Sequence, residues 1–300
     1  MESKIHPIEY SSFEIKKIIA DLRGRYPFSE WTPIGKTVAG RDIPALIIGT
    51  GTDYTVLQSG ADPAFRLGTL LLLRFAEELC QSVITGRELC GVNIRKAMFR
   101  RGVIILPTLN PDGAEIAQRG EVGCGYMSGK ISQMCGGEYS KWRANLRGVE
   151  LAGNFKGNFE QLTQRDTGSE NSGQPNFCGF YGYRPESEPE TVALANLIHK
   201  KPTRGFLELA APGNSVWYGR GETPPPGSAK MAQVLASVAG FSVTPPVGRS
   251  GAEICDYYAR ETGQPGFCVK LGEKQNIPQV SGLNSWYARL REALVLFSLI

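Results

Sequence analysis

Histidine is nearly absent from this chain of 300 residues, which contains only His6 and His199. A metal site or a catalytic mechanism that needs two converging imidazoles is therefore nearly excluded. The seven cysteines are irregularly spaced and form no Cys-x-x-Cys pair, which argues against a zinc ribbon or a dithiol redox site. An odd number of cysteines without a pattern instead predicts reduced thiols in a cytoplasmic protein.

Long apolar runs and strong charge are absent as well. The net charge is only +4, and the basic residues are scattered, so no nucleic-acid partner is expected. The most apolar run, around residues 70–73, is interrupted by Arg74, Glu77 and Glu78, and no signal-peptide pattern begins the chain. A membrane partner is therefore not expected either. The sequence does not indicate an oligomeric state.

Residues 55–73 carry the pattern around which the chain is organised. They read as a short buried strand, a tight turn through Ser59, Gly60 and Ala61, and a long apolar helix. Open α/β sheets bind ligands at the carboxyl ends of their strands, so this turn is predicted to lie at the functional site.

The rest of the chain alternates between strand and helix patterns. Further strands are predicted in 32–49 (two of them), 102–107, 205–210 and 266–271; helices are predicted at 13–26, 187–199, 228–239, around 252–261, and at 285–300. The helix near 187 is expected to begin with a capping box, Ser187-Glu-Pro-Glu190. Residues 108–113 read as a turn, and residues 121–185 as long functional loops. This alternation predicts an α/β fold with a sheet covered on both faces, in one domain spanning residues 1–300.

Six segments, in this order along the chain, carry a resemblance to a known family. They are Ile34-Gly-Lys-Thr-Val-Ala-Gly-Arg-Asp-Ile-Pro44, the turn at Ser59, Leu106-Pro-Thr-Leu-Asn-Pro-Asp-Gly113, Trp142-Arg-Ala-Asn-Leu-Arg-Gly-Val-Glu-Leu151, Ser187-Glu-Pro-Glu190 and Gly266-Phe-Cys-Val-Lys-Leu-Gly272. Together they resemble the zinc carboxypeptidases, and among these the bacterial γ-D-glutamyl-diaminopimelate peptidases that trim cell-wall peptides. The resemblance implies a twisted mixed sheet of about eight strands between helices.

The same resemblance implies that the catalytic residues have been replaced. The family holds zinc with a His-x-x-Glu pair and a later histidine, and these positions fall on Asp62, Phe65 and Ala210. The general-base glutamate falls on Lys270. The Asn-Arg pair that clamps the substrate falls on Ala152 and Gly153, and the tyrosine that closes over the substrate falls near Val247. We therefore expect no zinc and no other cofactor.

Three functions remain open after this comparison. The first is a degenerate, catalytically inactive protein whose former cleft binds a peptide or a cell-wall-peptide-like ligand. The second is an active metallocarboxypeptidase or γ-D-glutamyl-diamino acid peptidase with a non-standard metal site that uses Asp62 and either Glu208 or Glu273. The third is a scaffold or partner-binding protein with a filled cleft.

Individual residues also allow more than one interpretation. Asp62 is either a remaining metal ligand or, as we expect, the N-cap of the following helix, with Pro63 in its first turn. Phe65 is expected to fill the space of the metal. Lys270 should face the cleft, either as a reactive amine or, as we favour, as an ammonium paired with a carboxylate, for which Glu208 and Asp62 are the candidates.

The remaining candidates would contact the substrate. Arg143 and Arg147 are suited to grip a carboxylate, although arginines in loops are equally often solvated. Asn154 follows the substituted clamp. Trp217 and Tyr218 either line a peptide groove or pack beneath the long loops, and packing is slightly favoured.

Overall fold

The computed structural model describes residues 3–165, 173–219, 224–246, 253–273 and 276–300. The strands are β1 Glu30–Lys36, β2 Asp42–Ile48, β3 Tyr54–Gln58, β4 Gly102–Leu106, β5 Thr203–Ala210, β6 Ser215–Tyr218, β7 Ser242–Thr244 and β8 Gly266–Lys270. The longer helices are α1 Ser12–Arg25, α2 Arg66–Thr85, α4 Pro111–Arg119, α6 Ser128–Cys135, α8 Asn158–Arg165, α9 Pro189–Lys200, α10 Ser228–Ala239, α11 Ile254–Thr262 and α12 Leu283–Phe297. Three shorter helices are α3 Ile94–Met98, α5 Glu121–Cys124 and α7 Leu151–Asn154.

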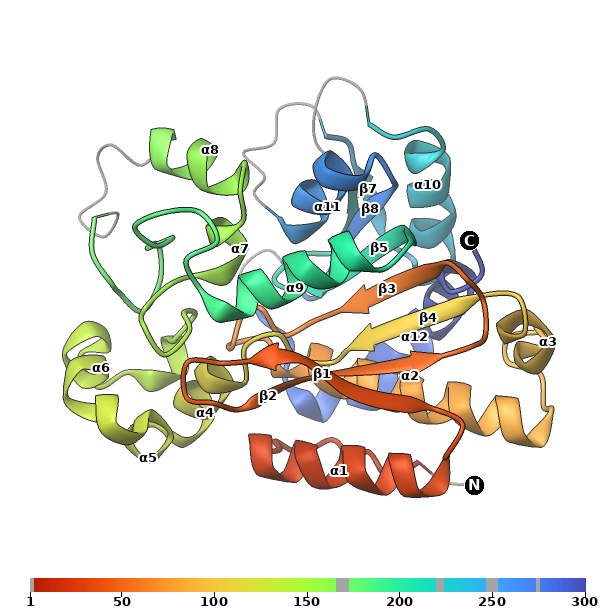
Figure 1. Cartoon of the computed structure of the whole chain (residues 1–300), viewed down its shortest axis with the longest axis horizontal. Coiled ribbons are helices and arrows are strands. Elements are labelled where there is room, and N and C mark those ends of the chain that lie inside the picture. Colours follow the sequence, from red (N-terminus) through yellow and green to blue (C-terminus); the bar gives the residue numbers. More distant parts are fainter. Residues whose placement is uncertain (1–2, 166–172, 220–223, 247–252, 274–275) are drawn as a thin grey trace.

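One mixed sheet of eight strands, in the order β1-β2-β4-β3-β5-β8-β6-β7, runs through the described part of the chain. The central strands β4, β3, β5 and β8 are parallel, while β1, β2 and β6 pair in the antiparallel sense. Helices cover both faces of the sheet (Figure 1). The predicted fold is therefore confirmed, including the number of strands.

Alternating side chains along the strands supply two separate cores. In β8, Phe267 and Val269 join the core under α2, α10 and α12, whereas Cys268 joins the core under α9 and α11. The period-two prediction for β8 is thus correct, and Lys270 lies on the same face as Cys268. A third, smaller cluster fills the space between α4, α5 and α6.

Some local predictions differ from the structure. The predicted turn at 108–113 contains the start of α4, because the Asn110 side chain caps the helix by accepting from the amide of Gly113 and Pro111 occupies the first turn. The predicted capping box at Ser187 is absent: Glu188 precedes α9, and the Glu190 carboxylate accepts from Asn145 instead. Within 121–185, the described residues include the helices α5, α6, α7 and α8, where long loops were predicted. Strands β6 and β7 were not predicted. No described helix is long and apolar enough to span a membrane.

Candidate functional site

A cleft of about 230 Å³ lies where β3, β5 and β8 end. The turn at Gly60 and Ala61 forms one of its walls, as expected from the position of this turn after a central strand. The charged residues that line the cleft, among those the structure describes, are Asp62, Arg143, Glu150, Glu208, Glu253 and Lys270. The cleft is therefore small, and its walls carry both signs of charge.

Asp62 is engaged by an arginine within the cleft. Its Oδ2 lies 2.5 Å from Nη2 of Arg143, and its Oδ1 accepts from the amide of Ala64 at 3.0 Å. The prediction that Asp62 caps the next helix is wrong. Asp62 belongs to a separate turn, closed by a hydrogen bond from the Phe65 amide to its carbonyl, and α2 begins only at Arg66.

The other two positions of the family's zinc ligands offer no donor atoms. Phe65 is 1% exposed, packs in the core with α2 and also lines the cleft. Ala210 ends β5 and has no donor atom in its side chain. Zinc needs about three protein ligands in a catalytic site, and here one carboxylate remains, already paired with Arg143. The residues present do not fit a zinc ion at this position.

Lys270 forms its ion pair with a residue that the sequence did not single out. Its Nζ lies 2.7 Å from Oε1 of Glu253, just before α11, and 4.2 Å from the centre of the Trp217 ring. An ammonium paired with a carboxylate was expected, but the pairing partner is neither Glu208 nor Asp62. Burial has the largest single effect and lowers the pKa of Lys270, but the charge and hydrogen bond of Glu253, together with other nearby groups, outweigh burial, so this pKa is raised above its ordinary value. A protonated amine is neither a nucleophile nor a base.

Glu208, Glu253 and Cys268 form a group whose side-chain donor atoms all lie within 4.8 Å of one another. Glu208 and Cys268 are register partners on β5 and β8, so their side chains share one face of the sheet. Burial, and then the charge of Glu253, raise the pKa of Glu208 to about 8, while burial raises the pKa of the Cys268 thiol. Thiolate and carboxylate oxygen are zinc donors, so this group could hold a metal ion if it released protons.

Of the two arginines predicted to contact substrate, only Arg143 lines the cleft. Its side chain is 39% exposed and its buried Nε has no hydrogen-bond partner. Burial raises the pKa of Glu150, which is nearby, and the positive charge of Arg143 opposes this effect. Arg147 is 54% exposed and lies 3.6 Å from a carboxylate oxygen of Glu188, outside the residues that line the cleft.

Of the other residues predicted to contact a ligand, one lines the cleft and two are buried in the protein. Asn154 is fully buried, and its amide oxygen accepts from the amide of Glu188 and the hydroxyl of Thr191, so it holds α9 rather than a ligand. Trp217 lines the cleft, whereas Tyr218, the next residue of β6, is buried in the opposite core.

Glu273, the alternative metal ligand, is exposed and is not among the described residues of the cleft wall. The predicted tyrosine position, Val247, lies outside the described residues.

The sequence did not identify Glu253, Glu150 or Tyr181 as cleft residues. The sequence just before Glu253, residues 247–252, shows neither helical nor strand periodicity. The sequence nevertheless contains a signal for Glu253. Glu253 and Asp256 have the spacing of a helix capping box, and in the structure the Asp256 carboxylate accepts from the Glu253 amide.

Several known proteins resemble this chain in sequence or in structure. The chain is 25% identical over 287 residues to γ-D-glutamyl-L-diamino acid endopeptidase 1 of Lysinibacillus sphaericus, covering 93% of this chain and 69% of that protein. Bovine thrombin-activatable fibrinolysis inhibitor has a similar fold, with a TM-score of 0.74 and 14% identity over 99% of this chain and 98% of the other. The murein-tripeptide amidase MpaA of Escherichia coli O157 gives a TM-score of 0.52 and 16% identity over 90% and 95% of the two chains.

These likenesses correct one expectation and establish the family. The expectation that the chain has no cofactor is wrong, because the family is one of zinc carboxypeptidases and the described residues include the Glu208, Glu253 and Cys268 group, which could hold a metal. The zinc carboxypeptidase model matches residues 15–247, well over half of the sequence. This chain belongs to the zinc carboxypeptidase family.

Proposed function

We propose that this protein binds a peptide in its cleft and does not hydrolyse it at the family's usual zinc position. The observation that supports this proposal is the content of that position: an aspartate paired with Arg143, a buried phenylalanine and an alanine. Lys270, where the family's base would lie, carries a proton that its pairing with Glu253 retains. Neither a metal-activated water nor a general base is assembled there.

The ligand that we propose is a short peptide with a free carboxylate, of the γ-D-glutamyl-diamino acid type. Arg143 is the cleft's arginine, and a guanidinium binds a carboxylate through two parallel hydrogen bonds. The named activities of the Lysinibacillus sphaericus endopeptidase and of the murein-tripeptide amidase suggest this class of peptide. A cleft of about 230 Å³ has room for one terminus of such a peptide rather than for a long segment.

A second candidate is a hydrolase that uses a displaced metal. The Glu208, Glu253 and Cys268 group supports it, because carboxylate and thiolate are suitable zinc ligands. A metal bound there would have to displace the Lys270 ammonium from Glu253 and release protons from Glu208 and Cys268. When bound, such an ion would supply Lewis-acid chemistry beside the cleft.

The two candidates differ in metal content and turnover. The full chain is purified with added zinc, dialysed and analysed for metal, while binding of γ-D-glutamyl-diaminopimelate peptide is measured by calorimetry and its cleavage by chromatography. We expect saturable binding without cleavage. Cleavage that is abolished by a chelator and by Cys268→Ser would overturn the proposal in favour of the displaced metal.

Two arginine variants test where the peptide binds. Arg143→Gln removes the cleft guanidinium and should weaken peptide binding about tenfold, since a hydrogen bond to a charged group contributes about 1.5 kcal/mol or more. Arg147→Gln is the matched control, because it removes an exposed arginine outside the cleft wall. Equal losses in both variants, or no binding by the parent protein, would contradict a ligand in this cleft.

We also propose that the protein works in a reducing compartment such as the cytoplasm. All seven cysteines are free thiols, and five of them are buried. Thiols without disulfide partners are typical of reducing compartments. Titration of accessible thiols in freshly lysed cells tests this point, and disulfide-linked chains would contradict it.

A further inference from the structure

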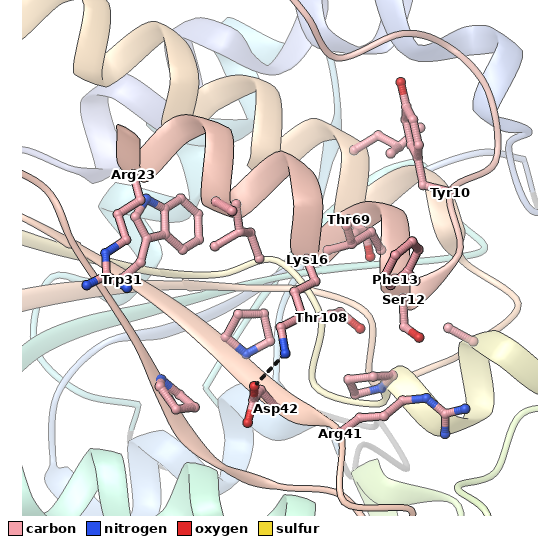
Figure 2. A pocket seen from close by; sticks show the side chains of 18 of the residues that line it. Tyr10, Ser12, Phe13, Lys16, Arg23, Trp31, Arg41, Asp42, Thr69 and Thr108 are labelled. Carbon is pink, nitrogen blue, oxygen red and sulfur yellow. Dashed lines mark ion pairs between the residues drawn. The ribbon is translucent and has the colours of Figure 1, made fainter. Parts of the chain in front are cut away.

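A second and larger cavity lies on the opposite side of the sheet from the cleft. It has a volume of about 850 Å³ and is bounded by α1, by the strands β1 and β2, and by the start of α2 (Figure 2). Small-molecule pockets typically measure about 300–1,000 Å³. The cavity is therefore large enough for a small organic ligand, and none of the cleft residues lines it.

The interior of this cavity is apolar. Its wall includes Ile15 and Ile19 of α1, Trp31 of β1, Pro44 of β2 and Leu70 of α2. At the rim, Ile8 is 53% exposed and Phe13 is 64% exposed. Large apolar side chains that remain exposed around an apolar cavity are a mark of a binding site.

The cations around the cavity are paired, with one exception among the described residues. Lys16 and Lys36 contact Asp42, Arg41 contacts Asp112, and Arg66 contacts Glu9. Arg23 has no ion pair within the described parts of the chain, and it lines the cavity from the last turns of α1. One positive charge at the cavity is thus left for a ligand.

A second polar group, which lacks a hydrogen-bond partner, lies near this arginine. The buried indole nitrogen of Trp31, a hydrogen-bond donor, has no acceptor. In Figure 2 the Trp31 ring and the Arg23 side chain lie together at one end of the cavity, with Tyr10 and Phe13 at the other. The two groups differ in burial. The Trp31 nitrogen is buried, where polar groups are usually satisfied, whereas the Arg23 side chain is exposed and carries its charge at the mouth of the cavity.

We infer that this cavity binds an amphipathic monocarboxylate, with its apolar chain between α1 and the sheet and its carboxylate at Arg23 and Trp31. The apolar wall favours the chain, and the unpaired guanidinium favours a single negative charge. A dianion would find Arg23 as the one lining cation without an ion pair among the described residues, and a cationic amphiphile would meet Arg23 with like charge. The proposal is independent of whether the cleft binds or cleaves a peptide.

Laurate is the probe for this site, used with the full chain below the concentration at which laurate self-associates. We expect saturable binding at one site by equilibrium dialysis and an increase in melting temperature with laurate concentration. Affinity should rise from octanoate to decanoate to laurate, by up to about fourfold for each buried methylene. Absence of saturable binding would overturn the inference.

Two charge variants locate the carboxylate. Arg23→Gln should weaken laurate binding about tenfold and leave dodecanol binding unchanged, because dodecanol has the chain without the charge. Lys130→Gln is the control, since Lys130 is an exposed cation on α6 and lies outside the cavity wall. An equal loss in both variants, or equally tight binding of dodecyltrimethylammonium, would contradict a carboxylate held at Arg23. A peptide titration of Arg23→Gln should match the parent protein, which separates this test from the cleft.

Discussion

The cleft at the strand ends and the cavity under α1 differ in size and, more instructively, in how their charged residues are paired. The cleft at the strand ends is small, and its cations Arg143 and Lys270 are held by Asp62 and Glu253. The cavity under α1 is almost four times larger and keeps one cation, Arg23, without an ion pair among the described residues. The cleft therefore holds its cations in internal ion pairs, whereas the cavity has a cation without an ion pair among the described residues.

The largest expected effect tests the internal pairing of the cleft. Lys270 and Glu253 are only 14% and 18% exposed, so Lys270→Met would leave a buried carboxylate without its cation. Removing one partner of a buried pair costs about 3–5 kcal/mol. We expect a loss of this size in the free energy of unfolding measured with urea.

A double variant and a surface variant make this result interpretable. Lys270→Met combined with Glu253→Gln should recover much of the stability, because no unpaired charge remains. Lys141→Met breaks an exposed pair with Glu138 and should cost less than about 1 kcal/mol. If Lys270→Met lowered the free energy of unfolding by less than about 1 kcal/mol, the Glu253 carboxylate would not be buried enough to need its cation.

The second prediction concerns a buried carboxyl group that lines neither the cleft nor the cavity. Glu190 is fully buried on α9, and burial raises its pKa from 4.5 to about 7. Between these pH values the unfolded chain releases the proton while the folded chain keeps it, so stability falls as pH rises. The fall from this group amounts to about 3 kcal/mol, at 1.36 kcal/mol for each pKa unit.

Glu190→Gln should therefore flatten the decrease in stability between pH 4.5 and pH 7. The measurement is urea unfolding of parent and variant at several pH values, and the quantity compared is the change with pH in each protein. An identical pH dependence in both would mean that Glu190 ionises normally in the folded chain.

Close packing around Phe65, at the family's zinc position, gives the third prediction. A Cβ on Gly68 would lie 2.0 Å from Oγ of Ser59 and 2.6 Å from Cε1 of Phe65. The Ser59 hydroxyl donates to the carbonyl of Leu209, so Gly68→Ala also threatens the link between the turn after β3 and strand β5. We expect a loss of about 2 kcal/mol in unfolding free energy.

Gly129→Ala is the control, because it adds the same methyl group to α6 with nothing within 4 Å. Alanine is a better helix former than glycine, so this variant should gain up to about 1 kcal/mol. A neutral Gly68→Ala would show that the space beside Phe65 is open, and would reopen the possibility of a ligand there.

Much of the fold was predictable from the sequence, because period-two and helical patterns report which faces are buried. The face assignment of Phe267, Cys268 and Val269 followed from alternation alone. The short strands β6 and β7 were not predicted, since three or four residues carry too little pattern. The capping box at Ser187 failed because tertiary contacts with Asn145 took the Glu190 carboxylate.

The cleft residues that come at or shortly after the end of a strand could be predicted from the sequence, whereas the partner of Lys270 could not. Asp62, Phe65 and Lys270 lie at strand ends, so their positions in the cleft follow from the sheet. The partner of Lys270 did not follow, because Glu253 reaches the cleft through the packing of α11. The cavity under α1 gave no sequence signal, since it results from a gap between a helix and a sheet that each look normally amphipathic.

The smallest expected effect on stability concerns this gap. Ala114 of α4 lines the cavity and is half-buried, so Ala114→Leu extends into space rather than into neighbouring atoms. We expect a change within about 0.5 kcal/mol in unfolding free energy, together with a several-fold loss of laurate affinity because the ligand's space is reduced. Ala117→Leu, three residues later on α4, enlarges a buried residue in the packed cluster beside α5 and α6 and should cost about 1–3 kcal/mol. If the two leucine variants were equally destabilised, the region under α1 would be as tightly packed as the core, and the contrast between the cleft and the cavity would not hold.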